Sequence, residues 1–316
     1  MYRKIMSYLE TWQESTYRKP LILQGARQVG KTYSVLEFGR THYDNVAYFN
    51  FETNPKLNKT FEENISPDYL IPILSHMAGQ TIVKEKTLIV FDEVQLCERA
   101  LTSLKYFCED APDYHIIVAG SLLGVAVNRA KFSFPVGKVD MKTLYPMDME
   151  EFMLALGEDN LVSQIKESFV SDKPLPSALH DAAMQLYRQY LVVGGMPECV
   201  MQYAETKDYI LVRHTQDTIL ASYLNDMSKY NNLNEIKKTR LTYDNITVQL
   251  SKKNTRFQYK LIKKGGRASE FENAIEWLCL SGIVSQVYRV EQIKKPLENY
   301  RDIDAFKIYV SDMGLL

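Results

Sequence analysis

The fold of this 316-residue chain is decided by the stretch Gly25-Ala26-Arg27-Gln28-Val29-Gly30-Lys31-Thr32. It matches the pattern G-x-x-x-x-G-K-[ST] of phosphate-binding loops at every fixed position. The apolar run at residues 21–23 predicts a buried strand before it, and residues 33–40 predict a helix after it. A glycine loop in this context directs backbone N–H groups and a helix N-terminus at a polyphosphate. Residues 25–32, called the phosphate loop from here on, therefore predict a nucleotide site.

Each part of the phosphate loop has an expected task. We expect the Lys31 ammonium to reach the β- and γ-phosphates and the Thr32 hydroxyl to ligate Mg²⁺. Gly25 and Gly30 allow the backbone to curl closely around the anion. The expected nucleotide-binding residues are Gly25, Ala26, Arg27, Gln28, Val29, Gly30, Lys31 and Thr32.

A pair of carboxylates, Asp92-Glu93, follows the apolar run at residues 87–91. A buried strand of this kind delivers its last residues to the carboxyl edge of the sheet, where α/β proteins bind ligands. We expect Asp92 to hold Mg²⁺, directly or through a water. Glu93 would orient and polarise the attacking water. An apolar run with two acids can also be a strand that ends in a polar turn, but beside the phosphate loop the pair favours hydrolysis.

Ser121 follows a further predicted strand at residues 115–119. In a neighbouring parallel strand its hydroxyl would lie near the γ-phosphate and hold the lytic water by a hydrogen bond. The alternative is that Ser121 caps the next helix. We expect Ser121 to sense the γ-phosphate, so that it joins Lys31 and Glu93 as a catalytic residue.

Several polar residues give weaker signals near this edge. Asn50 and Glu52 end another predicted strand, and Glu52 is a less favoured alternative to Glu93. Arg27 could contact phosphate or a neighbouring subunit. Arg129 and Lys138 follow the strand before Ser121, where a transition-state cation from a neighbouring subunit is expected. Each of these charges also fits an ordinary solvated surface position.

Composition restricts the class of protein. The chain is 46% hydrophobic and 24% charged, as expected for a globular protein, and its net charge of -1 gives no overall attraction to nucleic acid or anionic membrane. No apolar run approaches the ~20 residues that span a bilayer, and the N-terminus has no signal-peptide core. The four cysteines form no C-x-x-C pair, which favours a reducing compartment and argues against a zinc site. We therefore predict a cytoplasmic protein with no membrane partner.

The predicted elements change in character along the chain. Strands and helices alternate up to about residue 148, which predicts a parallel sheet with helices on both faces. Helix-favouring sequence follows, broken at Gly194-Gly195. Residues 235–292 predict three helices and a strand, and residues 306–310 predict a second strand, an order typical of a winged-helix domain. The chain ends directly after that strand, so we expect a truncated product or a missing further domain.

A basic stretch lies in the predicted winged helix, at residues 252–267. It contains no acidic residue, and Phe257 and Tyr259 are interleaved with its charges. The seven basic residues are Lys252, Lys253, Arg256, Lys260, Lys263, Lys264 and Arg267. This composition is typical of a surface that contacts the phosphate backbone of DNA. A solvated basic face or an intramolecular docking surface remains the alternative.

Six motifs in a fixed order resemble those of a known family. They are GARQVGKT (25–32), NFE (50–52), FDEVQ (91–95), AGSLLG (119–124), LYPMDMEEF (144–152) and GGMPE (194–198). The combination resembles the prokaryotic AAA+-type ATPases of the archaeal-type ATPase group, which carry a C-terminal domain of unknown function. The resemblance implies an ATPase core, a helical lid, a winged helix and usually a restriction-endonuclease-like fold after residue 316.

The resemblance also bears on the substrate and on one catalytic cation. It implies adenine rather than guanine, and the sequence has no N-K-x-D motif for reading guanine. Relatives tend to carry Gly-Arg after the sensor strand, where this chain has Gly137-Lys138. An arginine finger at that position is therefore not expected here.

Together these patterns predict an α/β P-loop NTPase (AAA+-like) with a parallel sheet, a helical lid and a winged-helix domain. The expected domains are 1–148 for the ATPase core, 149–232 for the lid, and 233–316 for the winged helix and the start of an incomplete β region. The expected function is ATP hydrolysis with Mg²⁺ as a molecular switch or motor. DNA and a second copy of the chain are expected partners. An ATP-gated protein-interaction module and a nucleotide-binding scaffold with negligible turnover remain alternatives.

Overall fold

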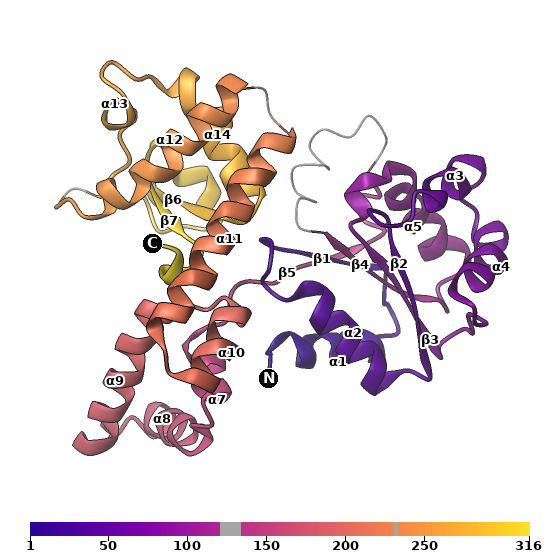
Figure 1. Cartoon of the computed structure of the whole chain (residues 1–316), viewed down its shortest axis with the longest axis horizontal. Helices are drawn as coiled ribbons and strands as arrows, with labels where there is room; N and C mark the ends of the chain where they lie inside the picture. Colours follow the sequence, from indigo (N-terminus) through magenta and orange to yellow (C-terminus); the bar gives the residue numbers. More distant parts are fainter. Residues whose placement is uncertain (121–133, 231–232, 254) are drawn as a thin grey trace. The chain divides into compact units, whose positions relative to one another are not determined.

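The first part of the molecule is built around a parallel β-sheet (Figure 1). The computed structural model describes residues 1–120, 134–230, 233–253 and 255–316, and the chain divides into two units, Met1–Tyr145 and Pro146–Leu316. In the described part of the first unit, five strands lie in the order β2-β3-β4-β1-β5. Their bounds are β1 Leu21–Gln24, β2 Asn45–Asn50, β3 Thr87–Asp92, β4 His115–Gly120 and β5 Asp140–Thr143. All neighbouring pairs are parallel, which confirms the predicted sheet.

The register of the central strands brings the carboxyl ends of β1, β2, β3 and β4 to one edge. Asn50 pairs with Asp92, Asp92 pairs with Ala119, and Gln24 pairs with Gly120. Every residue of β3 and β4 is buried. Such continuous apolar strands are stable only where helices cover both faces of the sheet. The polar residues that end these strands are therefore collected at the edge above a dry core.

Helices cover both faces of this sheet (Figure 1). They are α1 Ile5–Glu14, α2 Lys31–His42, α3 Lys56–Glu63, α4 Pro67–Ala78 and α5 Glu98–Asp110. Side chains of α3, α4 and α5 pack in one apolar cluster with Ile89 and Phe91 of β3. Helix α2 lies on the opposite face of the sheet. Its Gly39 is next to Leu88 of β3, and Leu88 points away from the face that carries Ile89 and Phe91 because side chains alternate along a strand. A Cβ on Gly39 would lie 2.6 Å from Val46 Cγ2, so glycine allows the helix to approach the sheet closely.

The second unit begins with a set of helices. They are α7 Met149–Ala155, α8 Asp159–Ser171, α9 Ser177–Val193, α10 Pro197–Thr206 and α11 Tyr209–Tyr230. Asp148 and Glu151 form a capping box at the start of α7, since each side chain accepts a hydrogen bond from the backbone N–H of the other. Helix α9 ends at Val193, directly before Gly194, and Pro197 begins α10, so a break falls here as the sequence predicted.

Three helices and a β-hairpin complete the second unit. They are α12 Leu233–Leu250, α13 Tyr259–Ile262, α14 Ala268–Leu280, β6 Val284–Val290 and β7 Arg301–Val310. The two strands are antiparallel, with an irregularity between Tyr288 and Arg289. Phe306 and Ile308 of β7 are buried, whereas the intervening Lys307 is exposed. The order of elements is the one that the sequence predicted for residues 235–310.

A turn at Gly194-Gly195, called the glycine turn from here on, packs against Asp312 near the end of the chain. The Gly195 N–H donates a hydrogen bond to Asp312 Oδ2. A Cβ on Gly194 would lie 2.2 Å from Asp312 Oδ1, and a Cβ on Gly195 would lie 2.0 Å from the Met147 carbonyl oxygen. Only glycine fits at either position. This contact joins three segments of the second unit that are far apart in the sequence.

Candidate nucleotide-binding site

The phosphate loop turns tightly between β1 and α2. The φ angles of Gly25, Gln28 and Gly30 are 149°, 65° and 89°, which are conformations that favour glycine at the two fixed glycine positions. A Cβ on Gly25 would also lie 2.1 Å from the Leu144 carbonyl oxygen. Helix α2 begins at Lys31, so the loop leads directly into the free N–H groups of its first turn. This geometry is suited to an anion.

Lys31 lies inside the loop and is 7% exposed. Its Nζ donates to the carbonyl oxygens of Gly25 at 2.9 Å and Ala26 at 2.7 Å. Burial lowers the pKa of Lys31 to about 8, and the nearby carboxylates of Glu93 and Asp92 oppose that shift. The ammonium is thus buried with two neutral acceptors, which a phosphate oxygen would replace with a stronger charge-assisted partner.

Asp92 organises the polar groups at the end of β3. Its Oδ2 accepts hydrogen bonds from Thr32 Oγ1 at 2.9 Å and from the Tyr48 hydroxyl at 2.7 Å. Its Oδ1 accepts from the Glu93 N–H at 3.0 Å. Asp92 is 4% exposed. A carboxylate and a hydroxyl oxygen in direct contact are the hard donors that Mg²⁺ prefers, so this pair fits the predicted metal site.

Glu93 occupies a left-handed conformation with a φ of 53°, directly after the buried strand. Burial raises the pKa of its carboxyl group, and a hydrogen bond from Gln95 Nε2 limits the rise. A more basic carboxylate is a better acceptor for the proton of an attacking water. The sequence did not predict a role for Gln95, but its side chain holds the predicted catalytic carboxylate of Glu93.

The structure places the remaining candidates differently. Ser121 and Arg129 lie outside the described residues. Asn50 Oδ1 accepts hydrogen bonds from the N–H groups of Glu52, at 2.9 Å, and Thr53, at 3.0 Å, and so caps the turn after β2. The Glu52 side chain is exposed to solvent. Asn50 therefore has a local structural task.

The two described candidate cations also differ. Lys138 Nζ forms an ion pair with Glu109 Oε1 at 2.9 Å, which raises the pKa of Lys138. Arg27 lies close enough to help lower the pKa of Lys31 and to counter the rise in the pKa of Glu93. Arg27 therefore contributes positive potential to the site, while Lys138 is engaged with an acid on α5.

Two residues that the sequence did not single out contact this site. Arg3 is buried, and its guanidinium donates to the carbonyl oxygens of Val29 at 2.9 Å and Tyr145 at 2.8 Å. It thus ties the phosphate loop to the segment after β5. Tyr48 of β2 donates to Asp92, and burial raises the pKa of its hydroxyl to about 12. The sequence could have indicated Tyr48, because it lies two residues before Asn50 and therefore on the same face of β2.

Three further features of the described residues bear on the class of protein. No helix in the described ranges has both the length and the hydropathy needed to cross a bilayer. All four cysteines, Cys97, Cys108, Cys199 and Cys279, are free thiols. His115 is a core residue: burial lowers its pKa to about 4, and it shares a 2.7 Å hydrogen bond with the Tyr43 hydroxyl.

The strand order, the phosphate loop and Asp92 together define the class of P-loop NTPases. Comparison with protein families agrees with this class. Residues 17–153 match a family described as an AAA domain, and residues 184–316 match a domain of unknown function, DUF8612. Residues 17–153 therefore carry an AAA domain within a P-loop NTPase fold, and residues 184–316 match a domain of unknown function.

Three solved structures illustrate the similarities found. The Walker-type ATPase of Pyrococcus abyssi known as PABY2304 is 14% identical, with 99% of this chain and 94% of that chain covered and a TM-score of 0.58. The ORC2 protein of Aeropyrum pernix is 12% identical, with 98% and 90% covered and a TM-score of 0.47. The RuvB Holliday junction branch migration motor of Thermotoga maritima is 13% identical, with 89% and 87% covered and a TM-score of 0.38. At these identities only the first likeness supports a conclusion, and it concerns the fold. A comparison with curated proteins gave no match.

Proposed function

We propose that this protein binds ATP with Mg²⁺ and hydrolyses it as a molecular switch or motor. The observation that carries the proposal is the contact between Thr32 and Asp92 beside the buried ammonium of Lys31. These groups come from the phosphate loop after β1 and from the end of β3, which β4 separates from β1 in the sheet. A polyphosphate and its cation are bound at this edge in this class of fold. The likeness to a Walker-type ATPase in overall fold is in keeping with it.

The residues of the site divide the work by chemistry. The loop N–H groups and Lys31 bind and orient the phosphates, and Thr32 and Asp92 hold the cation. Mg²⁺ held by Thr32 and Asp92 would neutralise negative charge on the phosphates. Glu93 accepts a proton from the attacking water while Gln95 fixes the direction of its carboxylate. Ser121 remains our candidate for sensing the γ-phosphate.

Two substitutions separate binding from turnover. Lys31→Ala removes the buried cation and should abolish ATP binding, measured by calorimetry in the presence of Mg²⁺. Glu93→Gln keeps the shape of the side chain but removes its basicity. It should leave ATP binding within about twofold and reduce phosphate release by roughly 100-fold or more. Unchanged ATP affinity in the first variant, or normal phosphate release in the second, would refute the assigned role.

We further propose that the ATPase cycle moves the helices of residues 149–232 and thereby a winged-helix domain at 233–316 that contacts DNA. The support is the run of three helices followed by an antiparallel hairpin, with basic residues concentrated at 252–267. Turnover is measured alone, with single-stranded DNA and with duplex DNA. Stimulation by DNA supports this proposal. Stimulation by a protein but not by DNA would select a protein-interaction switch, and no phosphate release under any condition would select a scaffold.

A further inference from the structure

The outer face of the β6–β7 hairpin carries side chains that the core of the second unit does not use. In the antiparallel register Val287 lies opposite Lys307, and Ser285 lies opposite Tyr309. Val287 is 50% exposed and Tyr309 is 41% exposed. The alternate residues Phe306 and Ile308 are buried on the other face. The strand alternation thus presents an aliphatic side chain, an aromatic ring and a cation together on one exposed surface.

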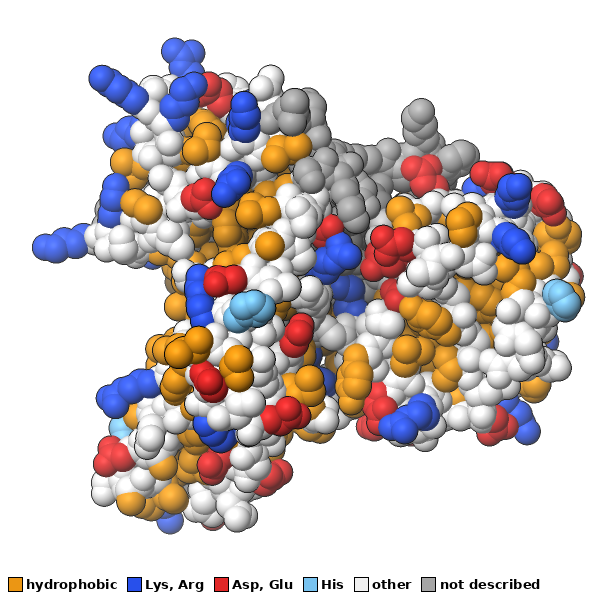
Figure 2. All heavy atoms as spheres, in the orientation of Figure 1, with side chains coloured by type: hydrophobic (Ala, Val, Ile, Leu, Met, Phe, Trp, Pro, Cys, Tyr) orange, Lys and Arg blue, Asp and Glu red, His pale blue; other side chains and the backbone are white. Residues whose placement is uncertain are grey.

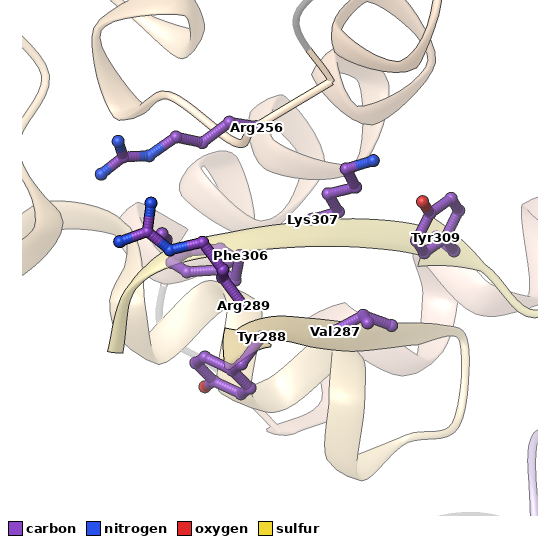
Figure 3. A pocket seen from close by; sticks show the side chains of 8 residues that line it. Arg256, Val287, Tyr288, Arg289, Phe306, Lys307 and Tyr309 are labelled. Atoms are coloured by element: carbon purple, nitrogen blue, oxygen red, sulfur yellow. The ribbon is translucent and has the colours of Figure 1, made fainter. Parts of the chain in front are cut away.

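A hollow of about 360 Å³ lies on this face (Figure 3). Arg256, Arg289 and Lys307 line it, and Figure 3 shows their charged groups on the same side of the hairpin. Its aromatic lining residues are Tyr309 on this face and the paired Tyr288 and Phe306, which belong to the opposite face of the hairpin. Such a hollow is large enough to take one nucleotide unit of a strand.

The rim formed by Arg256 is held in place by the hairpin itself. Arg256 Nη2 donates to the Asp304 carbonyl oxygen at 2.8 Å. The next residue, Phe257, donates its N–H to the Phe306 carbonyl oxygen at 2.9 Å and stacks on the Phe306 ring at 5.6 Å between centroids. The segment before α13 is therefore anchored to β7, so that a guanidinium from another part of the chain is fixed beside those of the strand.

The hollow has a positive excess. None of its lining residues is acidic. Arg289 Nη2 pairs with Asp302 Oδ2 at 2.5 Å, so the Arg289 guanidinium already faces an acid. The pair involves an Arg289 side chain that is 63% exposed, so solvent screens the attraction and the guanidinium keeps other donors for a ligand. The chemistry required of a ligand is therefore anionic and partly apolar.

We propose that this hollow binds single-stranded nucleic acid, with a phosphodiester held by the three cations and an unpaired base stacked on Tyr309. Guanidinium groups bind phosphate through paired N–H donors, and base stacking on an exposed aromatic ring is typical of single-strand binding. A duplex would offer phosphates but no free base face for the ring. The inference rests on the proposed action of this ATPase on nucleic acid and gives that action a location.

The basic stretch at residues 252–267 differs from this hollow in one respect. Figure 2 shows Lys and Arg side chains over the part of the second unit that carries α12 to α14. Lys264 is exposed there, and Lys263 Nζ lies 4.0 Å from Glu270 Oε1. Of the seven basic residues in the stretch, Arg256 lines the hollow. The hollow therefore combines charge with the exposed ring of Tyr309, whereas Phe257 in the basic stretch is buried and Tyr259 is partly buried.

The test is a fluorescence anisotropy titration of the full chain, without nucleotide, using a labelled 20-mer of thymidine and a labelled duplex. The variants are Lys307→Glu and Tyr309→Ala, both exposed on the hairpin. The matched control is Lys294→Glu in the loop of the same hairpin, which does not line the hollow. A circular dichroism melt of each variant checks that it remains folded.

We expect Lys307→Glu to weaken single-strand binding about tenfold or more and to lower the dependence of the affinity on salt. Tyr309→Ala should weaken it about 5- to 100-fold, in line with the loss of one stacked base, while Lys294→Glu stays within about twofold. Equal losses in Lys294→Glu and Lys307→Glu, tighter binding of the duplex, or no binding by the wild type at low salt would each overturn the inference. Strand binding without phosphate release would instead leave the hollow intact and remove the proposed ATPase.

Discussion

The phosphate loop and the glycine turn use similar backbone geometry for opposite purposes. In the first unit, Gly25 and Gly30 open a loop whose N–H groups face a site for an exchangeable anion. In the second unit, the Gly195 N–H faces the chain's own carboxylate at Asp312, which is 4% exposed. An anion that leaves can report on a reaction cycle, whereas one that is part of the chain can only hold segments together. The difference separates a candidate active site from a structural joint.

The largest expected effect lies at the structural joint. Gly195→Ala would place a Cβ 2.0 Å from the Met147 carbonyl oxygen. This oxygen belongs to the backbone, so it cannot move aside as a flexible side chain could. We expect the free energy of unfolding of the second unit to fall by about 3 kcal/mol or more. Trp277, buried in α14, reports on this unit in a Trp12→Phe background.

A second glycine provides the control for Gly195→Ala. Gly157 has a φ of 82° but open space where a Cβ would lie. Gly157→Ala should therefore cost only the strain of the backbone conformation, about 1–2 kcal/mol. An equal loss in the two variants would mean that the steric contact at the glycine turn does not set its stability.

The pH dependence of the same joint should be smaller but specific. Burial raises the pKa of Asp312 from 3.8 to about 6, and the N–H groups of Gly195, Gly314 and Leu315 limit the rise. Because the folded-state pKa lies above the unfolded value, the contribution of the neutral carboxyl is fully present below pH 3.8 and is lost as the pH rises through 6. The loss should approach about 3 kcal/mol.

Asp312→Asn isolates this contribution, because the amide keeps an acceptor for Gly195 and does not ionise. Denaturant unfolding between pH 3.5 and 7 should show a decline with pH in the wild type that is reduced in the variant. Parallel curves for the two proteins would show that Asp312 does not take up a proton in this range.

The phosphate loop is also held by a residue distant in the sequence, Arg3, and a substitution there tests how much that contact contributes. Arg3→Gln removes the hydrogen bonds to the Val29 and Tyr145 carbonyl oxygens and leaves both without that donor. The cost is about 1–3 kcal/mol, and we expect ATP affinity to fall about tenfold because the loop is less ordered before binding.

Arg18→Gln is the matched control for Arg3. Arg18 donates to the Gln13 carbonyl oxygen at 2.7 Å, close to the end of α1 and not to the phosphate loop. Its replacement should change stability without changing ATP affinity by calorimetry. If both variants lose stability equally and bind ATP as the wild type does, Arg3 has a structural task only.

The sequence predicted those features that a local pattern can encode. The phosphate loop, the buried strand before Asp92 and the break at Gly194-Gly195 are each specified within about ten consecutive residues. Lys31, Thr32 and Asp92 could be grouped because parallel strands of this fold end at one edge. The sequence pattern therefore predicted that these residues lie at the same edge of the sheet, but it did not predict the hydrogen bonds between them.

The contacts that the sequence did not predict join distant segments. Arg3 and Val29 are 26 residues apart, and Gly195 and Asp312 are 117 residues apart. No periodicity or motif links such pairs, because their distance in space is set by packing and not by local geometry. The hollow of the β6–β7 hairpin was missed for the same reason: Arg256 reaches it from outside both strands. A count of basic residues along the chain could not separate it from the rest of the stretch.

The smallest expected effect is at Tyr48, where the phosphate loop and the strand edge meet. Its hydroxyl is one of three donors to the Asp92 carboxylate, with Thr32 and the Glu93 N–H. Tyr48→Phe removes a single hydrogen bond, worth about 0.5–1.5 kcal/mol. The carboxylate would then be less well oriented toward the cation, so the Mg²⁺ concentration that half-saturates ATP binding should rise about two- to tenfold. The control is Tyr33→Phe, because Tyr33 lies on α2 and is 58% exposed. The same Mg²⁺ midpoint in all three proteins would show that Thr32 and the backbone alone hold Asp92, and that the anion site needs no support from β2.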